Sequence, residues 1–312
     1  MKQHTARTTL TTDDGARLAV YTVGAPSAPV TVILSHGYLM TADTWRIQTR
    51  ELVNRGYRVV RYDQRAHGNS AGGQAFTIDR LGRDLAQVIA TTAADGPMVL
   101  GAHSMGGMAA MAAAAVQPHI FARRETRVAL ISTSCSKAIF KPSNRPAHWG
   151  KGASRAGFAS SVCWRPSVTD ALRRRLPKGN PWALRPDEDR NEGAPPPNRE
   201  AIHHTRTEQI AQLWTSLRSF DATGKLDALH RLGDRVEIAT GALDDWIPLT
   251  QIRLLAAQLP LACTHEPIPG ARHRLPTDRN GSSAVTRMLI QMCEAIPHQA
   301  IPVDAGQNAR TR

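Results

Sequence analysis

The sequence predicts an α/β fold, in which a mostly parallel central sheet is flanked by helices. Short β-branched apolar runs alternate with longer amphipathic runs, and the segments between them are short. Strand, helix and strand joined in this way give parallel strands with right-handed crossovers. Residues 134–230 break the alternation and contain no apolar run of strand length, which predicts an insertion between two core segments, residues 1–133 and 231–312.

Each core element follows from a local pattern. Apolar and β-branched runs ended by turn residues predict strands at Arg17–Thr22, Pro29–Ser35, Arg58–Asp63, Pro97–Leu100, Arg127–Ser132, Val236–Thr240 and Cys263–Ile268. Apolar residues at helical spacing, or a run of alanine and methionine, predict helices at Thr44–Arg55, Thr77–Ala94, Met108–Val116, Ile252–Leu259 and Ser283–Ala295. Asp63 ends its strand, and we expect its carboxylate to hold amides of the following turn.

Length and composition indicate a globular chain that buries a sizeable core. Of 312 residues, 41% are hydrophobic and 21% charged, which excludes the disordered and fibrous classes. The longest apolar run, Met108–Val116, is too short to cross a bilayer, and Met1–Arg7 leads into no apolar segment of signal length. We therefore expect a soluble, cytoplasmic protein with no membrane span, while the oligomeric state stays open.

The net charge of +13 is concentrated in the insertion, where residues 134–230 carry 16 basic and 9 acidic residues. A basic surface can attract nucleic acid, an anionic substrate or an acidic partner protein. Because no nucleic-acid motif accompanies the charge, we expect a solvated surface and no nucleic-acid binding. The four cysteines form no CxxC pair, so the sequence supports neither a disulfide framework nor a metal site, and we expect free thiols at Cys135, Cys163, Cys263 and Cys293.

The stretch around Ser104 predicts a nucleophile at a sharp turn. A short strand ends near Leu100 and an alanine-rich helix follows Gly107, which leaves room only for a tight turn. Such a turn strains the serine backbone and presses helix against strand, so the residues two before and two after must be small, as Ala102 and Gly106 are. A helix start that binds phosphate, or merely packs closely, is the alternative for this stretch alone.

The turn resembles the nucleophile elbow of the α/β-hydrolase family, G-x-S-x-G, with Ala102 in place of the first glycine. The resemblance implies that Ser104 attacks an acyl carbon and that the Met105 N–H stabilises the oxyanion. The run His36-Gly37-Tyr38 closes an upstream strand and is similar to the family's second oxyanion element, which makes the Tyr38 N–H the second donor. An ordinary strand-ending turn is the alternative there.

The acid and the base are expected near the end of the chain. Glycine, aspartate and proline in residues 241–248 are spaced as in the family's acid loop, which points to Asp244, with Asp245 as the competitor. His273 follows the last predicted strand. Ser104, Asp244 and His273 therefore fall in the chain order that this fold uses.

The insertion resembles the mainly helical cap that covers the active site in this family. Residues 134–230 hold four of the six tryptophans, and such rings need a surface to cover, so we expect the underside of the cap to line an acyl or alkyl pocket. The predicted substrate-binding residues are His36, Gly37, His103, Trp164 and Trp214. The alternatives are a His103 ring within the core and tryptophans that only attach the cap to it.

The resemblance implies a serine hydrolase that cleaves a carboxylic ester through an acyl-enzyme, with a small ester or acyl substrate and no cofactor. A serine nucleophile argues against the aspartate-dependent branches of the family, the epoxide hydrolases and dehalogenases. A thioesterase or acyltransferase acting on an acidic acyl carrier protein is one alternative, because the insertion is basic. A non-catalytic binding protein on the same scaffold is the other.

Overall fold

The central element is an eight-stranded sheet with the order β1-β2-β4-β3-β5-β6-β7-β8. The structure is a computed structural model, which describes residues 5–93, 96–122, 125–137 and 206–297. The strands are β1 (Ala6–Thr11), β2 (Arg17–Val23), β3 (Thr31–Ser35), β4 (Arg58–Tyr62), β5 (Met98–His103), β6 (Thr126–Ile131), β7 (Val236–Ala239) and β8 (Cys263–Thr264). The pairs β1/β2 and β2/β4 are antiparallel, and the remaining pairs are parallel, which confirms the predicted fold class.

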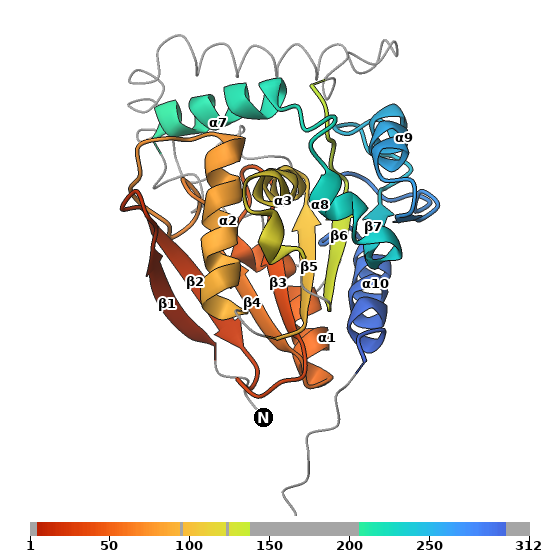
Figure 1. Cartoon of the computed structure of the whole chain (residues 1–312), viewed down its shortest axis with the longest axis horizontal. Helices are drawn as coiled ribbons and strands as arrows, with labels where there is room; N and C mark the ends of the chain where they lie inside the picture. The colour runs from red at the N-terminus through yellow and green to blue at the C-terminus, as the bar shows by residue number, and fades with distance from the viewer. Residues whose placement is uncertain (1–4, 94–95, 123–124, 138–205, 298–312) are drawn as a thin grey trace, which may run out of the picture.

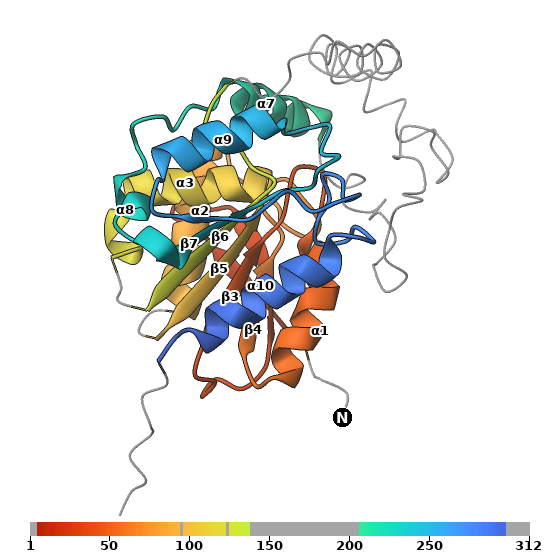
Figure 2. The same ribbon diagram turned by 90° about the vertical axis from the view of Figure 1, so that its right-hand side faces the viewer.

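Helices cover both faces of the sheet (Figure 1; Figure 2). One face carries α1 (Arg46–Asn54) and α10 (Ser282–Glu294), and the other carries α2 (Ile78–Thr92), α3 (Met105–Val116) and α8 (Asp227–His230). Each face has its own cluster of buried apolar side chains, so the sheet separates two hydrophobic cores. Short 3₁₀ helices lie at Ala42–Trp45, Pro118–Ile120 and Gly233–Arg235.

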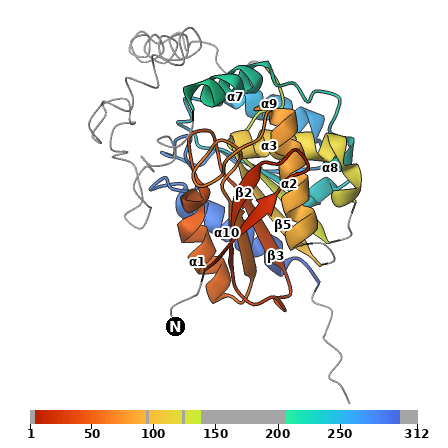
Figure 3. The same cartoon turned by 90° about the vertical axis from the view of Figure 1, so that its left-hand side faces the viewer.

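Two further helices, α7 (Thr207–Ser219) and α9 (Leu249–Gln258), lie at the end of the sheet toward which the arrow of β5 points in Figure 1. Figure 3, turned by 90° from Figure 1, also shows α7 above this end of the sheet. Ligands of open parallel sheets bind at the carboxyl ends of the strands. The two helices therefore flank the end of the sheet where the sequence places Ser104.

The structure differs from the predicted elements at the two sheet edges. The sequence pattern misses β1, because all but one of its residues are exposed and Leu10 is its sole apolar residue beyond Ala6. The predicted strand Cys263–Ile268 is too long, since β8 ends at Thr264, although Ile268 still forms an isolated parallel bridge with Gly241. Edge strands bury little and so leave a weak hydrophobic signal.

The residues on either side of the segment 138–205 lie against each other. The Cys135 carbonyl accepts a hydrogen bond of 2.8 Å from the Ala222 N–H, and Leu226 and Leu229 belong to the buried apolar cluster on the α3 side of the sheet. The division into a core and an insertion of residues 134–230 stays a prediction. Residues 138–205, which include the predicted Trp164, lie outside the described residues. None of the described helices is both long and apolar enough to cross a membrane.

Candidate active site

Ser104 sits at the turn between β5 and α3 with a left-handed backbone, φ 53° and ψ −118°. A side chain on such a backbone is strained, and the strain turns the hydroxyl away from the sheet. The close approach of helix and strand explains the small neighbours, because a Cβ on Gly106 would lie 2.4 Å from the Ser35 carbonyl oxygen. Thr133 fixes the turn by donating its hydroxyl to the Ser104 carbonyl at 2.8 Å.

Three predicted residues meet in one hydrogen-bonded line. The His273 Nε2 lies 3.0 Å from the Ser104 Oγ, and its Nδ1 lies 2.9 Å from one carboxylate oxygen of Asp244. The Asp244 carboxylate also accepts the backbone N–H groups of Trp246 and Ile247, each at 2.9 Å. The side chain of Asp244 is only 1% exposed. The spacing argument for Asp244 over its exposed neighbour Asp245 therefore agrees with the geometry.

The environment of Asp244 keeps its carboxyl ionised. Burial alone would raise its pKa, but the charge and hydrogen bond of His273 and the two backbone amides hold the pKa below its ordinary value. A permanent carboxylate at this place binds the Nδ1–H of His273. The Nε2 that faces Ser104 is thereby left as an acceptor.

The loop after β3 lies against the first turn of α3. A Cβ on Gly106 would lie 2.8 Å from the His36 carbonyl oxygen, so the loop that carries Gly37 and Tyr38 reaches the helix end at Met105. The Tyr38 hydroxyl donates to the Ile210 carbonyl at 2.9 Å, which joins this loop to α7. The loop that carries Tyr38 thus lies beside the first turn of α3, which begins at Met105.

Two buried histidine rings connect the loop after β3 to the turn after β4 by hydrogen bonds. His36 donates its Nδ1–H to the Gly37 carbonyl at 2.8 Å and accepts the Gln64 N–H on Nε2 at 2.9 Å. His67 donates to the Arg65 carbonyl and accepts the Leu39 N–H on Nε2 at 3.0 Å. The His36 side chain is fully buried with both ring nitrogens bonded to backbone groups, and its predicted contact with substrate stays a prediction.

His103 likewise lies beneath the surface, with no exposed area. Its Nε2–H donates to the backbone carbonyl of His273 at 2.8 Å, and its Nδ1 has no hydrogen-bond partner among the described residues. A Cβ on Gly37 would lie 2.9 Å from that Nδ1. The ring therefore fills the space between the elbow, the loop after β3 and the His273 loop, as the core alternative for His103 required.

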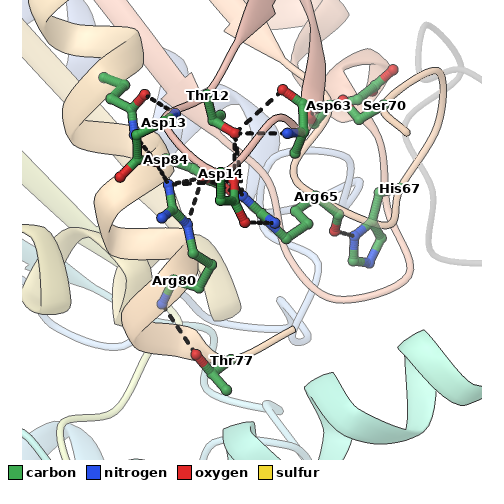
Figure 4. A network of polar contacts seen from close by, with 12 residues as sticks. Thr12, Asp13, Asp14, Asp63, Arg65, His67, Ser70, Thr77, Arg80 and Asp84 are labelled. Atoms are coloured by element: carbon green, nitrogen blue, oxygen red, sulfur yellow. Dashed lines mark hydrogen bonds and ion pairs between the residues drawn. The ribbon is translucent and has the colours of Figure 1, made fainter. Parts of the chain in front are cut away.

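A buried ion network fixes the turn after β4, as Figure 4 shows. The fully buried guanidinium of Arg65 pairs with both carboxylate oxygens of Asp84 and both of Asp14, at 2.7–2.8 Å. Burial disfavours the charge, yet these bonds raise the pKa of Arg65. Because the Arg65 carbonyl accepts the Nδ1–H of His67, the network extends to the loop that carries Tyr38.

Asp63 has the structural role that the sequence predicted. Its carboxylate accepts the Ala42 N–H at 2.8 Å and the Asn69 N–H at 2.9 Å, and the Tyr21 hydroxyl donates to it at 3.0 Å. A Cβ on Gly68 would collide with the same carboxylate. The aspartate therefore fixes the turn that follows its strand, as expected.

Three aromatic rings pack beside His273. The Trp246 ring stacks on the His273 ring at 5.7 Å between centroids, and Trp214 of α7 lies 5.7 Å from Tyr38 and 6.4 Å from Trp246. All of these rings are half-buried. Sequence reasoning named Trp214 and missed Trp246, although its place two residues after Asp244 was a usable signal.

A second carboxylate, also missed, shapes the loop of His273. Asp278 is 4% exposed and accepts the backbone N–H groups of Arg272, Asn280 and Gly281 at 2.8–3.0 Å. An aspartate that holds its own loop leaves no local pattern distinct from an ordinary turn. The position of the His273 ring thus depends on Asp278 as well as on its hydrogen bonds to Ser104 and Asp244.

The strand order and the strained serine turn between β5 and α3 are those of the α/β-hydrolase fold, and solved structures with a TM-score above 0.6 over more than 90% of the chain show that it has this fold. A family model described as "Serine aminopeptidase, S33" matches residues 26–165. Among solved structures, the chain is similar to a thermophilic esterase from Thermogutta terrifontis, with a TM-score of 0.64, 23% identity, and coverage of 94% of this chain and 99% of that one.

Curated relatives match only part of the chain. Epoxide hydrolase A of Mycobacterium tuberculosis is 36% identical over 122 residues, which is 38% of this chain and 36% of that protein. The bifunctional esterase/perhydrolase DCH of Acinetobacter calcoaceticus is 32% identical over 99 residues, 31% of this chain and 35% of that protein. The matches thus span about a third of each relative's length.

Proposed function

We propose that the chain is a serine hydrolase that cleaves a carboxylic ester through an acyl-enzyme intermediate. The observation that carries this proposal is the line of contacts from Ser104 Oγ through His273 to Asp244, at 3.0 and 2.9 Å. These distances fall in the range needed for a nucleophile, its general base and the group that orients the base. The strained backbone of Ser104 supports the same role.

In the first step, His273 Nε2 takes the hydroxyl proton while Ser104 Oγ attacks the ester carbon. The carboxylate of Asp244 holds the Nδ1–H and stabilises the imidazolium that forms. The Nε2–H then donates its proton to the departing alkoxide, which leaves the acyl group on Ser104. In the second step, the same Nε2 takes a proton from water while the water oxygen attacks the acyl carbon; the bond to Ser104 Oγ then breaks, the Nε2–H returns its proton to that oxygen, and the acid is released.

The backbone N–H groups of Met105 and Tyr38 serve as the oxyanion donors in this proposal. The Met105 amide opens α3, whose dipole favours negative charge at that end. Each such donor is worth about 10²- to 10³-fold in kcat for a serine hydrolase. The rings beneath the loop, His36 and His67, hold the Tyr38 segment in position without touching substrate.

The substrate favoured by the site carries an apolar acyl or alkyl group. Trp214, Trp246 and Tyr38 present half-buried aromatic faces beside His273, and such faces bury apolar carbon rather than charge. Graded p-nitrophenyl esters test this assignment. We expect Trp214→Ala to raise KM more for longer acyl chains than for acetate, whereas an equal effect on all esters would contradict it.

The nucleophile is tested by Ser104→Ala. We expect kcat to fall by about 10⁴- to 10⁶-fold with folding unchanged, as for other serine triads. A fluorophosphonate should label Ser104 and no other serine in the native chain, which mass spectrometry detects. An unchanged rate in the variant would refute the proposal.

The acid is tested by a matched pair of neighbours. Asp244→Asn removes the charge that holds His273 and should lower kcat by about 10⁴-fold, as loss of the triad acid does elsewhere. Asp245→Asn changes an exposed side chain and should leave kcat within about twofold. The opposite pattern would mean that the acid is misassigned.

Other functions, two of them left open by the sequence and one named in a relative, are outcomes of the same assays. A preference for acyl-carrier substrates that weakens with salt would favour a thioesterase or acyltransferase that docks an acidic carrier protein. Turnover of an epoxide that persists in Ser104→Ala would favour the chemistry named in the mycobacterial relative. No turnover of any acyl substrate, and no labelling of Ser104, would favour a non-catalytic binding protein.

A further inference from the structure

Three metal-binding side chains meet at the β7–β8 edge of the sheet. Glu237 of β7 pairs in parallel register with Cys263 of β8, so both side chains point to the same face. His265 lies two residues beyond Cys263 and continues the ladder by donating its backbone N–H to the Ile238 carbonyl at 2.9 Å. Period-two alternation returns its side chain to that face.

The donor atoms of these residues converge. The carboxylate of Glu237, the Sγ of Cys263 and a ring nitrogen of His265 all lie within 4.8 Å of one another, and the His265 Nε2 lies 2.6 Å from the carboxylate. In a tetrahedral zinc site with bonds of about 2.0–2.3 Å, donor atoms are separated by about 3.5 Å. Small side-chain rotations therefore suffice to place all three donors around one ion.

The cluster is accessible from solvent. Cys263 is exposed, and the side chains of His265 and Glu237 are 37% and 14% exposed, so an ion can enter from solvent. The Glu237 carboxylate supplies negative charge within the cluster, which favours binding of a divalent cation.

We propose that Glu237, Cys263 and His265 form a binding site for a divalent transition-metal ion of the zinc type, with solvent in the remaining position. Thiolate, imidazole and carboxylate are the three donor types that zinc takes in proteins. The strand β7 leads to Asp244 only after its carboxyl end, whereas Glu237 lies near its start, so the ion is outside the proposed hydrolytic site. Its effect is to link the two-residue strand β8 to the sheet.

Cobalt(II) is the probe that tests this site, because a cobalt–thiolate bond gives a charge-transfer band that carboxylate and imidazole ligands do not give. Tag-free full-length chain, freshly reduced, is titrated with Co²⁺. We expect the band to saturate at one ion per chain and to disappear when Zn²⁺ is added. Zinc should raise the Tm of the native chain, because an ion that binds only the folded state stabilises it.

Variants decide where the ion binds. Cys263→Ser should abolish the band and the Tm rise, and His265→Gln should weaken Co²⁺ binding at least tenfold. His119→Gln, which changes an exposed histidine elsewhere, is the matched control and should bind as the native chain does. His273→Ala should also retain the band. Circular dichroism checks that each variant is folded, and either loss variant suffices if the other does not fold.

The proposal is overturned by a band that persists in Cys263→Ser, by a band lost in His273→Ala, or by the absence of any band in the native chain. The first result would place the ion at another thiol, and the second at the hydrolytic histidine. The first and third outcomes leave the proposed ester hydrolysis untouched, and hydrolysis itself is measured separately with Ser104→Ala.

Discussion

Three buried histidines make the stability of this protein depend on pH. His36, His67 and His103 are at most 2% exposed, and each uses its neutral ring to bond backbone groups around the site. Burial holds the pKa of His36 well below the ordinary value of 6.5. It lowers the pKa of His67 to about 4 and that of His103 to about 3. All three rings therefore stay neutral in the folded state far below the pH at which an unfolded chain protonates them.

The sign and the size of the effect follow from proton linkage. Above pH 6.5 neither state binds these protons, so stability does not change on their account. Below it the unfolded chain takes up three protons that the folded chain refuses, and the free energy of unfolding falls by about 1.4 kcal/mol per histidine per pH unit. The three histidines together lower the free energy of unfolding by about 4 kcal/mol per pH unit, or by about 6 kcal/mol at pH 5. This loss is comparable with the whole stability of a domain.

Other groups with shifted pKa values act below this range or oppose the histidines. Burial raises the pKa of Asp63, so the folded chain takes up this proton at a higher pH than the unfolded chain does, which opposes the loss of stability. The pKa of Asp244 is lowered, so its contribution is lost only as the pH falls below the ordinary carboxyl range. His265 has a raised pKa because of Glu237, and its stabilisation is present at low pH and lost as the pH rises. This term opposes the three histidines, but solvent screens the partly exposed pair.

Urea unfolding followed by circular dichroism between pH 7.5 and 5 measures the slope. We expect the free energy of unfolding to fall by about 4 kcal/mol per unit below pH 6.5, and by about 1.4 kcal/mol per unit less in His67→Gln, whose amide oxygen can still accept the Leu39 N–H. Two results would refute the reasoning, because both would mean that these rings protonate in the folded state. One is a free energy of unfolding that falls by less than about 1.4 kcal/mol per pH unit, and the other is a slope in His67→Gln equal to that of the native chain.

Three substitutions test the scaffold of the site. Gly106→Ala places a Cβ 2.4 Å from the Ser35 carbonyl oxygen. We expect the free energy of unfolding in urea to fall by about 1–3 kcal/mol and most esterase activity to be lost. Native values of both would show that the backbone around Ser104 can shift to accept the methyl group. Thr77→Ala removes the hydroxyl that accepts the Arg80 N–H at the start of α2 and should lower stability by about 1 kcal/mol with kcat unchanged, while Thr77→Ser retains both. Asp278→Ala leaves three loop amides without their acceptor and should lower kcat at least tenfold by freeing the His273 loop; kcat within twofold of native would exclude that role.

Hydrophobic patterning predicted the buried core elements and failed where burial is low. The strands β3, β4, β5 and β6 are buried along almost their whole length, so their apolar content is visible in the sequence. The exposed strand β1 has no such content. Helix α7 was missed for a different reason, because it lies in the insertion, where no alternation with strands frames a 13-residue segment.

Local spacing pointed to side chains that the structure brings together, whereas contacts that depend on tertiary structure left no pattern in the sequence. The small residues around Ser104 and the glycine-to-proline spacing around Asp244 are local patterns. Ser104 lies at a tight turn against Gly106, and Asp244 contacts His273, as these patterns predicted. Trp246 contacts His273 only because two loops meet. The search for CxxC pairs passed over Cys263 for the same reason, since its partners Glu237 and His265 are brought to it by strand register.

The histidines show most clearly what a sequence leaves undecided. His36, His103 and His273 stand near turns at the ends of strands, and residue type and position alone make all of them candidates for contact with substrate. Their roles are separated by what each ring nitrogen bonds: carbonyls and amides for the first two, a serine hydroxyl and a carboxylate for the third. A ring whose nitrogens are bonded to backbone groups must keep one tautomer. The same imidazole is therefore a fixed support at two positions, and at the third it has the partners that the proposed mechanism requires of a general base.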